Sequence, residues 1–183
     1  GLLLPAALAI ALAVRDGGRL EDIGIRFDRL GRQILTGLGI GAIIGGIGLL
    51  AYLGSRWAGT SLNVVPTTLP DIWWRIPILV SFACANAILE EVVFCGYLLR
   101  RLDQLGFSAR RSVVVAALIR GGYHLYQGLA GALGNLAMGL VFGTYAKRTG
   151  RIIPLVVAHA AIDIVAYVGY VMLAGKVSWL PLP

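Results

Sequence analysis

Four side chains suited to acid–base chemistry stand inside apolar stretches of this chain. Glu90 and Glu91 are adjacent in the run 76–99, and the only two histidines, His124 and His159, each fall in a later apolar segment. An ionisable group in hydrocarbon is costly, so such residues mark functional sites. Carboxylates and imidazoles are the usual general acids and bases, so the pattern indicates hydrolysis or proton transfer.

Two further polar residues share helix faces with the histidines. Asp163 follows His159 by four residues, and Arg120 precedes His124 by four. Residues four apart are neighbours on one face of a helix, so each pair is predicted to point the same way. The sequence thus predicts one cluster of carboxylates, imidazoles and a guanidinium.

The composition indicates a membrane protein, so the elements that position this cluster are expected to be membrane-spanning helices. Of the 183 residues, 58% are hydrophobic and 14% charged, and the mean hydropathy is +0.82, which exceeds the usual range of soluble domains. Apolar runs approach the roughly 20 residues needed to cross a bilayer. The predicted fold is all-α, a polytopic transmembrane bundle with no sizeable soluble domain.

Six helices are expected. Their predicted ranges are 2–14, 34–52, 76–99, 112–126, 129–146 and 152–173. The first is too short to cross and is expected to be the truncated end of a longer helix. The predicted organisation is N-terminal helices with a basic loop over 1–75, a four-helix catalytic core over 76–174, and a tail over 175–183.

The net charge of +7 is concentrated in alternate short loops, which favours membrane topology over nucleic-acid binding. The arginine-rich loops are predicted to be cytoplasmic, with both ends of the chain on the opposite side. At about 1.5 Å per residue, several polar residues then lie roughly 12 to 20 Å from the basic loops. These residues are Glu90, His124, Asn135, His159 and Asp163. Their similar depth predicts one buried cavity.

Glycines recur at four-residue spacing in two of the predicted helices. One ridge is Gly37, Gly41 and Gly45, and the other contains Gly131, Gly139 and Gly143. Small residues at this spacing let membrane helices approach closely. Both ridges are therefore predicted to lie in helix–helix contacts.

Three short motifs carry a family resemblance. The runs EEVVFC at 90–95, RGGYH at 120–124 and HAAID at 159–163 resemble the ordered motifs of the CAAX-protease and bacteriocin-processing (CPBP) family of intramembrane proteases. This family is also described as CAAX prenyl protease type 2-like, or the Abi domain. The resemblance spans about 76–170, and the short loops suggest a prokaryotic member in the bacterial plasma membrane.

Two positions depart from the family pattern. Cys95 stands where the first motif has arginine, and Arg120 stands where the second has phenylalanine. Because Glu90 and Glu91 point about 100° apart on a helix, one is expected to face the cavity and the other to need a cation. We expect Arg120 to pair with Glu91 and leave Glu90 free.

The resemblance implies a hydrolytic mechanism. Glu90 would act as general base on a water, with His124 helping to hold or deprotonate it. His159 and Asp163 would stabilise the oxyanion. Asp163 would donate only if protonated, and would otherwise orient His159. Glu91, Arg120 and Asn135 are expected to support the site.

A zinc ion is the alternative to this glutamate-type mechanism, with Glu90, His124 and His159 as candidate ligands. No other cofactor is expected. The expected partners are a peptide or membrane-protein substrate and the lipid bilayer, but no nucleic acid. The family's best-known members remove three residues from prenylated proteins, whereas a prokaryotic substrate stays open.

Two other functions fit the same residues. Buried acids and histidines also occur in proton-coupled transporters, although this chain shows no inverted repeat. The two motif departures also fit a non-catalytic scaffold or an immunity-type member of the family.

Overall fold

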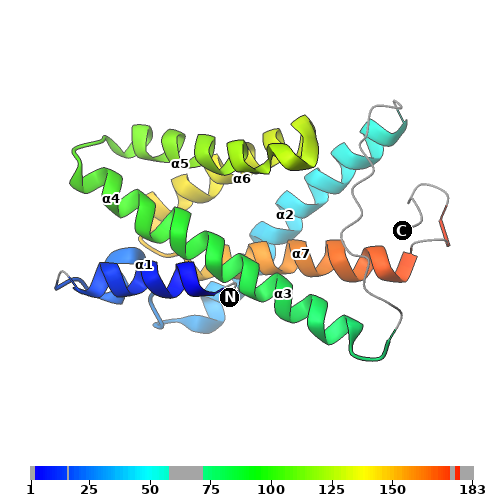
Figure 1. The fold of residues 1–183 in the computed structure, drawn as a ribbon, viewed down its shortest axis with the longest axis horizontal. Coiled ribbons are helices and arrows are strands. Elements are labelled where there is room, and N and C mark those ends of the chain that lie inside the picture. Colours follow the sequence, from blue (N-terminus) through cyan, green and yellow to red (C-terminus); the bar gives the residue numbers. More distant parts are fainter. Residues whose placement is uncertain (1–2, 16, 58–71, 174–175, 178–183) are drawn as a thin grey trace.

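A computed structural model describes residues 3–15, 17–57, 72–173 and 176–177. Within these residues all regular secondary structure is helical (Figure 1), as predicted. The elements are α1 (Leu4–Arg15), η1 (Leu20–Ile23), α2 (Leu30–Trp57), α3 (Arg75–Glu90), η2 (Glu91–Leu98), α4 (Leu99–Gln104), α5 (Ala109–Tyr123), η3 (His124–Gln127), α6 (Gly128–Thr149) and α7 (Ile153–Leu173). Each of the six predicted segments contains a helix. Most of the predicted tail lies outside the described residues.

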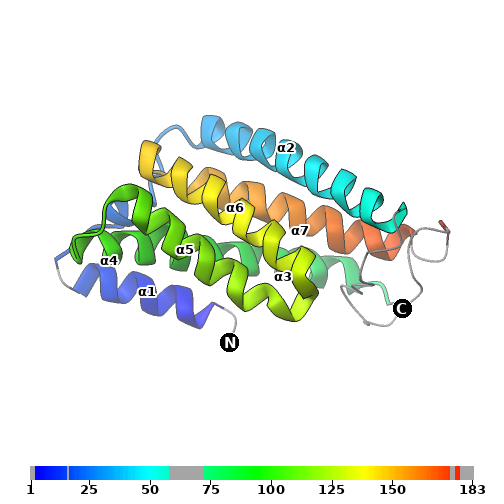
Figure 2. The same ribbon diagram turned by 90° about the horizontal axis from the view of Figure 1, so that it is seen from above.

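Four helical stretches in the described residues are long and apolar enough to cross a membrane. They are Leu30–Gly54, Arg75–Gln104, Ala109–Thr149 and Ile153–Leu173. The third stretch folds back on itself at Gly128, whose φ of 86° and ψ of 173° suit only glycine. It therefore forms an antiparallel hairpin of α5 and α6 (Figure 2), which agrees with the two segments predicted there. The protein is an integral membrane protein.

The bundle is held by close helix pairs. α2 packs along α7, α5 along α6, and α3 along α7, so α1 and α2 end up on opposite faces of the bundle (Figure 2). A Cβ atom on Gly37 would lie 2.5 Å from the Pro154 carbonyl oxygen, and one on Gly41 would lie 3.0 Å from that of Ala158. Gly139 and Gly143 approach α5 in the same way. The predicted role in helix contacts is confirmed for these four glycines. It is wrong for Gly131, where the atoms nearest to an added Cβ belong to Gln127 in the adjoining turn η3.

We expect Gly37→Ala and Gly41→Ala to destabilise the bundle by about 1 to 3 kcal/mol, because the added methyl group overfills a close backbone contact. Gly39→Ala and Gly46→Ala are the matched controls, since a Cβ at either position would meet no atom within 4 Å. These controls are expected to be neutral or slightly stabilising. Thermal unfolding in detergent measures the difference, and equal melting temperatures for both pairs would contradict the packing of α2 on α7.

The arginine-rich connections gather at one end of the bundle. Gln33 is buried and donates to the carbonyl oxygens of Arg26 and Asp28, both at 2.7 Å. Arg151 pairs with Asp28 at 2.5 Å, and this hydrogen bond lowers the pKa of the Asp28 carboxyl. Arg100 reaches the Ala13 carbonyl oxygen at 3.5 Å. The grouping agrees with the predicted topology, but which side is cytoplasmic stays a prediction.

One long helix changes its hydrogen-bond pattern where the glutamates lie. α3, η2 and α4 follow one another without a break (Figure 1), and η2, Glu91–Leu98, is π-helical. A π-helix bonds i to i+5, so its turn is wider than an α-turn, and such stretches are frequent at functional sites. Glu90 is the last residue of α3 and Glu91 the first of η2. The pair therefore stands at the junction of two helix types.

Candidate active site

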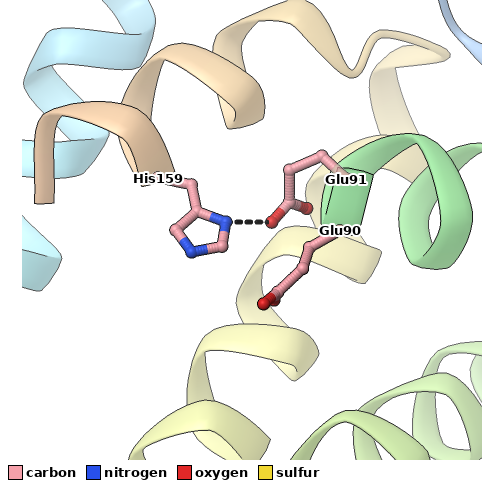
Figure 3. A group of neighbouring side chains, drawn as sticks. All are labelled: Glu90, Glu91 and His159. Atoms are coloured by element: carbon pink, nitrogen blue, oxygen red, sulfur yellow. Dashed lines mark hydrogen bonds and ion pairs between the residues drawn. The ribbon is translucent and has the colours of Figure 1, made fainter. Parts of the chain in front are cut away.

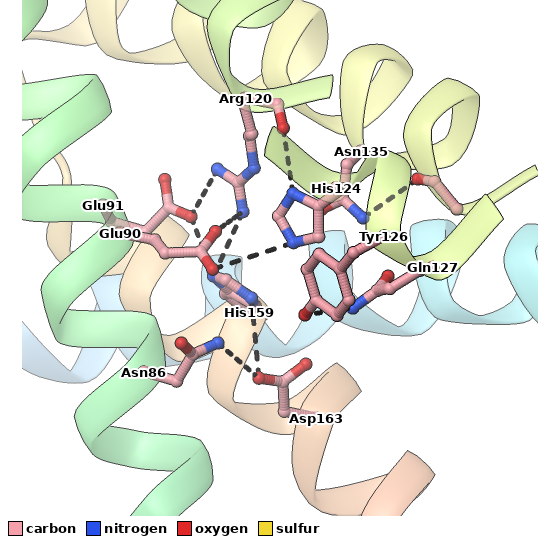
Figure 4. Close-up of polar contacts among 11 residues, drawn as sticks. Asn86, Glu90, Glu91, Arg120, His124, Tyr126, Gln127, Asn135, His159 and Asp163 are labelled. Atoms are coloured by element: carbon pink, nitrogen blue, oxygen red, sulfur yellow. Dashed lines mark hydrogen bonds and ion pairs between the residues drawn. The ribbon is translucent and has the colours of Figure 1, made fainter. Parts of the chain in front are cut away.

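Three parts of the bundle bring the predicted polar residues together (Figure 4). α3 and η2 supply the two glutamates, α5 and η3 supply Arg120 and His124, and α7 supplies His159 and Asp163. All of these residues are buried except Asp163, which is partly buried. For four of the five residues of similar predicted depth, Glu90, His124, His159 and Asp163, the depths thus correspond to one cluster in space.

Arg120 lies at the centre of the cluster. Its Nη1 donates to Glu91 Oε1 at 2.8 Å, and its Nη2 lies 3.0 Å from Glu90 Oε2. The side chain is 1% exposed, and its guanidinium lies 5.7 Å from the centre of the Phe142 ring. The expected pairing of Arg120 with Glu91 is therefore present.

The expectation that Glu90 stays free of Arg120 is wrong. The guanidinium is a planar fork with several N–H groups, so its two terminal nitrogens bind two separate carboxylates at once. The 100° between the glutamates does not prevent this, because they approach different nitrogens of one cation. Glu90 keeps Oε1 on the side away from the ion pair, 3.9 Å from His124 Nε2.

Cys95 occupies the place of the family's arginine. Its thiol is buried against Glu91, four residues earlier on the same helix. The chain therefore carries its cation on α5 instead of η2.

His124 is oriented by the main chain of α5, the helix that directly precedes it. Its Nδ1 lies 2.9 Å from the Arg120 carbonyl oxygen, which can only accept, so Nδ1 carries the proton and donates. In the neutral ring Nε2 is then unprotonated, and it faces Glu90. The rings of Tyr123 and Tyr126 lie beside the imidazole, with centroids at 4.1 and 6.1 Å. His124 is thus held ready to accept a hydrogen bond or a proton on the Glu90 side.

His159 connects two carboxylates. Its Nδ1 lies 2.9 Å from Glu91 Oε1 (Figure 3) and 3.2 Å from Arg120 Nη2. Since Glu91 accepts and Arg120 can only donate, the short contact with Glu91 assigns the proton to Nδ1. Nε2 points to Asp163 Oδ2 at 3.6 Å. His159 is therefore fixed in rotation by Glu91.

Asn86 belongs to the cluster but was missed in the sequence. Its Nδ2 donates to Asp163 Oδ2 at 3.1 Å (Figure 4). The available signal was its place four residues before Glu90, on the same helix face. Asn135, by contrast, donates to the Gly131 carbonyl oxygen of its own helix at 3.1 Å. This bond does not link Asn135 to the cluster, and its supporting role stays a prediction.

The cluster fits a metal ion poorly. The side chains with mutually close ligand atoms, within 4.8 Å, are Glu90, Glu91 and His159 (Figure 3), so Glu91 replaces His124 in the set expected from the sequence. The Arg120 guanidinium binds both glutamates, and a second cation there would be repelled. Glu91 Oε1 and His159 Nδ1 also bind each other, and a metal ligand needs an unprotonated nitrogen. The residues present thus provide a site for a guanidinium.

Comparison with known proteins identifies the family. No curated protein and no solved structure matches the chain. Residues 72–165, just over half of the chain, match the family described as type II CAAX prenyl endopeptidase Rce1-like. The matched region contains all three motifs, and a buried glutamate–histidine cluster between apolar helices is compatible with proteolysis inside a membrane. The chain belongs to the Rce1-like family of type II CAAX prenyl endopeptidases.

Proposed function

We propose that the protein is an intramembrane endopeptidase in which Glu90 activates the attacking water. The observation that supports this most directly is the arrangement of Glu90 and His124. Arg120 lies against Oε2 of Glu90, while Oε1 faces the unprotonated Nε2 of His124 at 3.9 Å. Two buried acceptors 3.9 Å apart are suited to bind the two protons of one water molecule.

The proposed reaction moves one proton twice. Glu90 takes a proton from the water as the water oxygen attacks the carbonyl carbon of the peptide bond, and an oxyanion forms. Glu90 then gives this proton to the leaving nitrogen, the C–N bond breaks, and the carbonyl reforms as a carboxyl group. Arg120 fixes the Glu90 carboxylate before the attack, because its Nη2 lies 3.0 Å from Oε2. His124 orients the water through its second proton.

The oxyanion is proposed to form near α7, on the side of His159 and Asp163. Donors aimed at developing charge in a water-poor site are worth more than in water. Burial of His159 and partial burial of Asp163 provide such surroundings. The mechanism uses no metal, in agreement with the poor fit of the cluster.

The family description suggests a peptide bond close to a prenylated cysteine as the target. We propose peptides anchored in the bilayer as the substrate class. The test uses purified protein in liposomes and a panel of fluorescence-quenched peptides: a farnesylated peptide ending in a CAAX sequence, its unprenylated counterpart and a single transmembrane peptide. Cleavage by the native protein that Glu90→Gln removes supports the proposal. Proton flux without cleavage would indicate a transporter, and neither activity would indicate a non-catalytic family member.

His159→Ala and Asp163→Ala are each expected to lower kcat with little change in KM. Both residues lie where the oxyanion is proposed to form, and loss of a group that contacts the oxyanion or holds its donor should reduce kcat by up to about 100- to 1000-fold. Initial rates over a range of peptide concentrations separate the two constants. Ser81→Ala is a suitable control, because this exposed hydroxyl donates to the Pro77 carbonyl oxygen of its own helix at 2.8 Å, away from the cluster. A change confined to KM would instead make the pair part of a substrate-binding surface.

A further inference from the structure

An oxyanion needs hydrogen-bond donors, and the two α7 residues offer few. An ionised carboxylate can only accept, and Asp163 Oδ2 already accepts from Asn86 at 3.1 Å. The proton of His159 Nδ1 is directed to Glu91 at 2.9 Å. A donor on the remaining side of the site would complete the mechanism proposed above.

The contact with Asp163 fixes the orientation of the Asn86 amide. The nitrogen and oxygen of an asparagine amide are assigned from their partners. Because a carboxylate oxygen accepts, the NH2 group of Asn86 must face Asp163, and the amide oxygen must face away. An NH2 group has two N–H bonds, and Asp163 Oδ2 takes one of them. The second N–H is thereby held in a fixed direction.

Asn86 also lies at the right place along α3. It precedes Glu90 by one helical turn, on the same face. Figure 4 shows both side chains extending from this helix toward α7, with Asn86 against Asp163 and Glu90 nearer His124. A carbonyl carbon attacked by water at Glu90 would thus have the Asn86 amide within about one turn, or about 5 Å, along the helix.

We propose that Asn86 is a catalytic residue that donates its second amide N–H to the oxyanion, and that Asp163 is the positioning residue that holds this amide. This inference rests on the proposed function. Asn86 transfers no proton: its hydrogen bond strengthens as the carbonyl oxygen gains charge and weakens when the carbonyl reforms. α3 then carries both the base and an oxyanion donor, one turn apart.

The test compares four variants on the panel peptide that the native protein cleaves fastest: Asn86→Ala, Asn86→Asp, Asp163→Asn and the exchange Asn86→Asp with Asp163→Asn. Asn86→Ala should lower kcat about 100-fold, the usual effect of one lost oxyanion donor, with KM unchanged. Asn86→Asp should be at least as harmful, since it places two acceptors face to face. The exchange restores one amide and one carboxylate, and should recover much of the kcat lost in Asn86→Asp.

Asp163→Asn shows whether the residue at 163 is needed for its hydrogen bonds or only for its shape, because asparagine keeps the size of aspartate. It supplies a second amide and should retain more activity than Asp163→Ala. Melting temperatures in detergent report folding for every variant, with Ser81→Ala as the reference.

Native kcat in Asn86→Ala, or no recovery in the exchange, would overturn the role of Asn86 while leaving the proteolytic function intact. Absence of any cleavage by the native protein would overturn both. If Asn86→Ala fails to fold, the comparison of Asn86→Asp with the exchange decides.

Discussion

Glu90→Gln should reduce kcat about 100- to 10,000-fold, the usual contribution of a general base. Glutamine keeps the size of the side chain and can still contact Arg120, but its amide cannot take a proton from water. The expected result is a folded protein without turnover. Cleavage of the panel peptides in liposomes measures kcat, and the melting temperature in detergent confirms folding.

Glu91→Gln is the informative control for this experiment. Glu91 Oε1 binds both Arg120 and His159, at 2.8 and 2.9 Å, whereas Glu90 faces the site through Oε1 at 3.9 Å from His124. Glu91→Gln should therefore lower the melting temperature more than Glu90→Gln does. Near-native turnover in Glu90→Gln would show that another group is the base.

Arg120→Leu should lower the free energy of unfolding by about 3 to 5 kcal/mol, the range found when one partner of a buried ion pair is removed. Leucine fills part of the volume but leaves two glutamates facing each other without a cation. Both are buried, with Glu91 at 0% exposure, so water cannot compensate either charge. Thermal unfolding in detergent, compared with Arg110→Leu on the exposed first turn of α5, measures the effect.

The double change Cys95→Arg with Arg120→Phe returns the cation to η2 and should recover much of this stability. Cys95→Arg alone puts a second cation beside Arg120 and should destabilise. The coupling between the two sites follows from a double-mutant cycle on unfolding. Strict additivity would mean that the two positions do not share the glutamates, and would contradict the idea that this chain has moved its cation.

The helices could be predicted from the sequence because hydropathy alone defines a membrane helix, as every backbone group must be bonded within it. How the helices pack against one another was harder to predict from the sequence. Gly37 and Gly41 indicated a close helix contact, but not that α7 is the partner. The turn between α5 and α6 depends on the backbone conformation of Gly128, one of 25 glycines, which composition does not distinguish.

The sequence predicted those contacts of the site that follow from the pairing of a buried charge with an opposite charge or from residues sharing a helix face. A buried arginine needs an acid, so Arg120 had to meet a glutamate, and His159 and Asp163 had to share a face. The second contact of Arg120, with Glu90, depends on the reach of a forked side chain. The contact of Asn86 with Asp163 depends on the packing of α3 against α7. Neither this contact nor that of Arg120 with Glu90 follows from the spacing of residues in the sequence. The candidate metal ligands Glu90, His124 and His159 stay a prediction, because the structure groups Glu90 and His159 with Glu91 instead of with His124.

The π-helical stretch Glu91–Leu98 has a consequence for what insertions and deletions the chain tolerates. A wide i-to-i+5 turn is what an α-helix becomes when one residue is inserted. The flanks on either side keep separate registers: Asn86 and Glu90 face α7, whereas Leu99 and Leu102 are buried in α4. A deletion of one residue within η2 would be absorbed by a return to α-helical bonding, with both flanks left on their present faces. The same deletion between Asn86 and Glu90, in the α-helical turn of α3, would rotate these two residues apart by about 100°. The amide and the base would then leave their shared face, so the chain should tolerate a change of length within η2 but not in the turn before it.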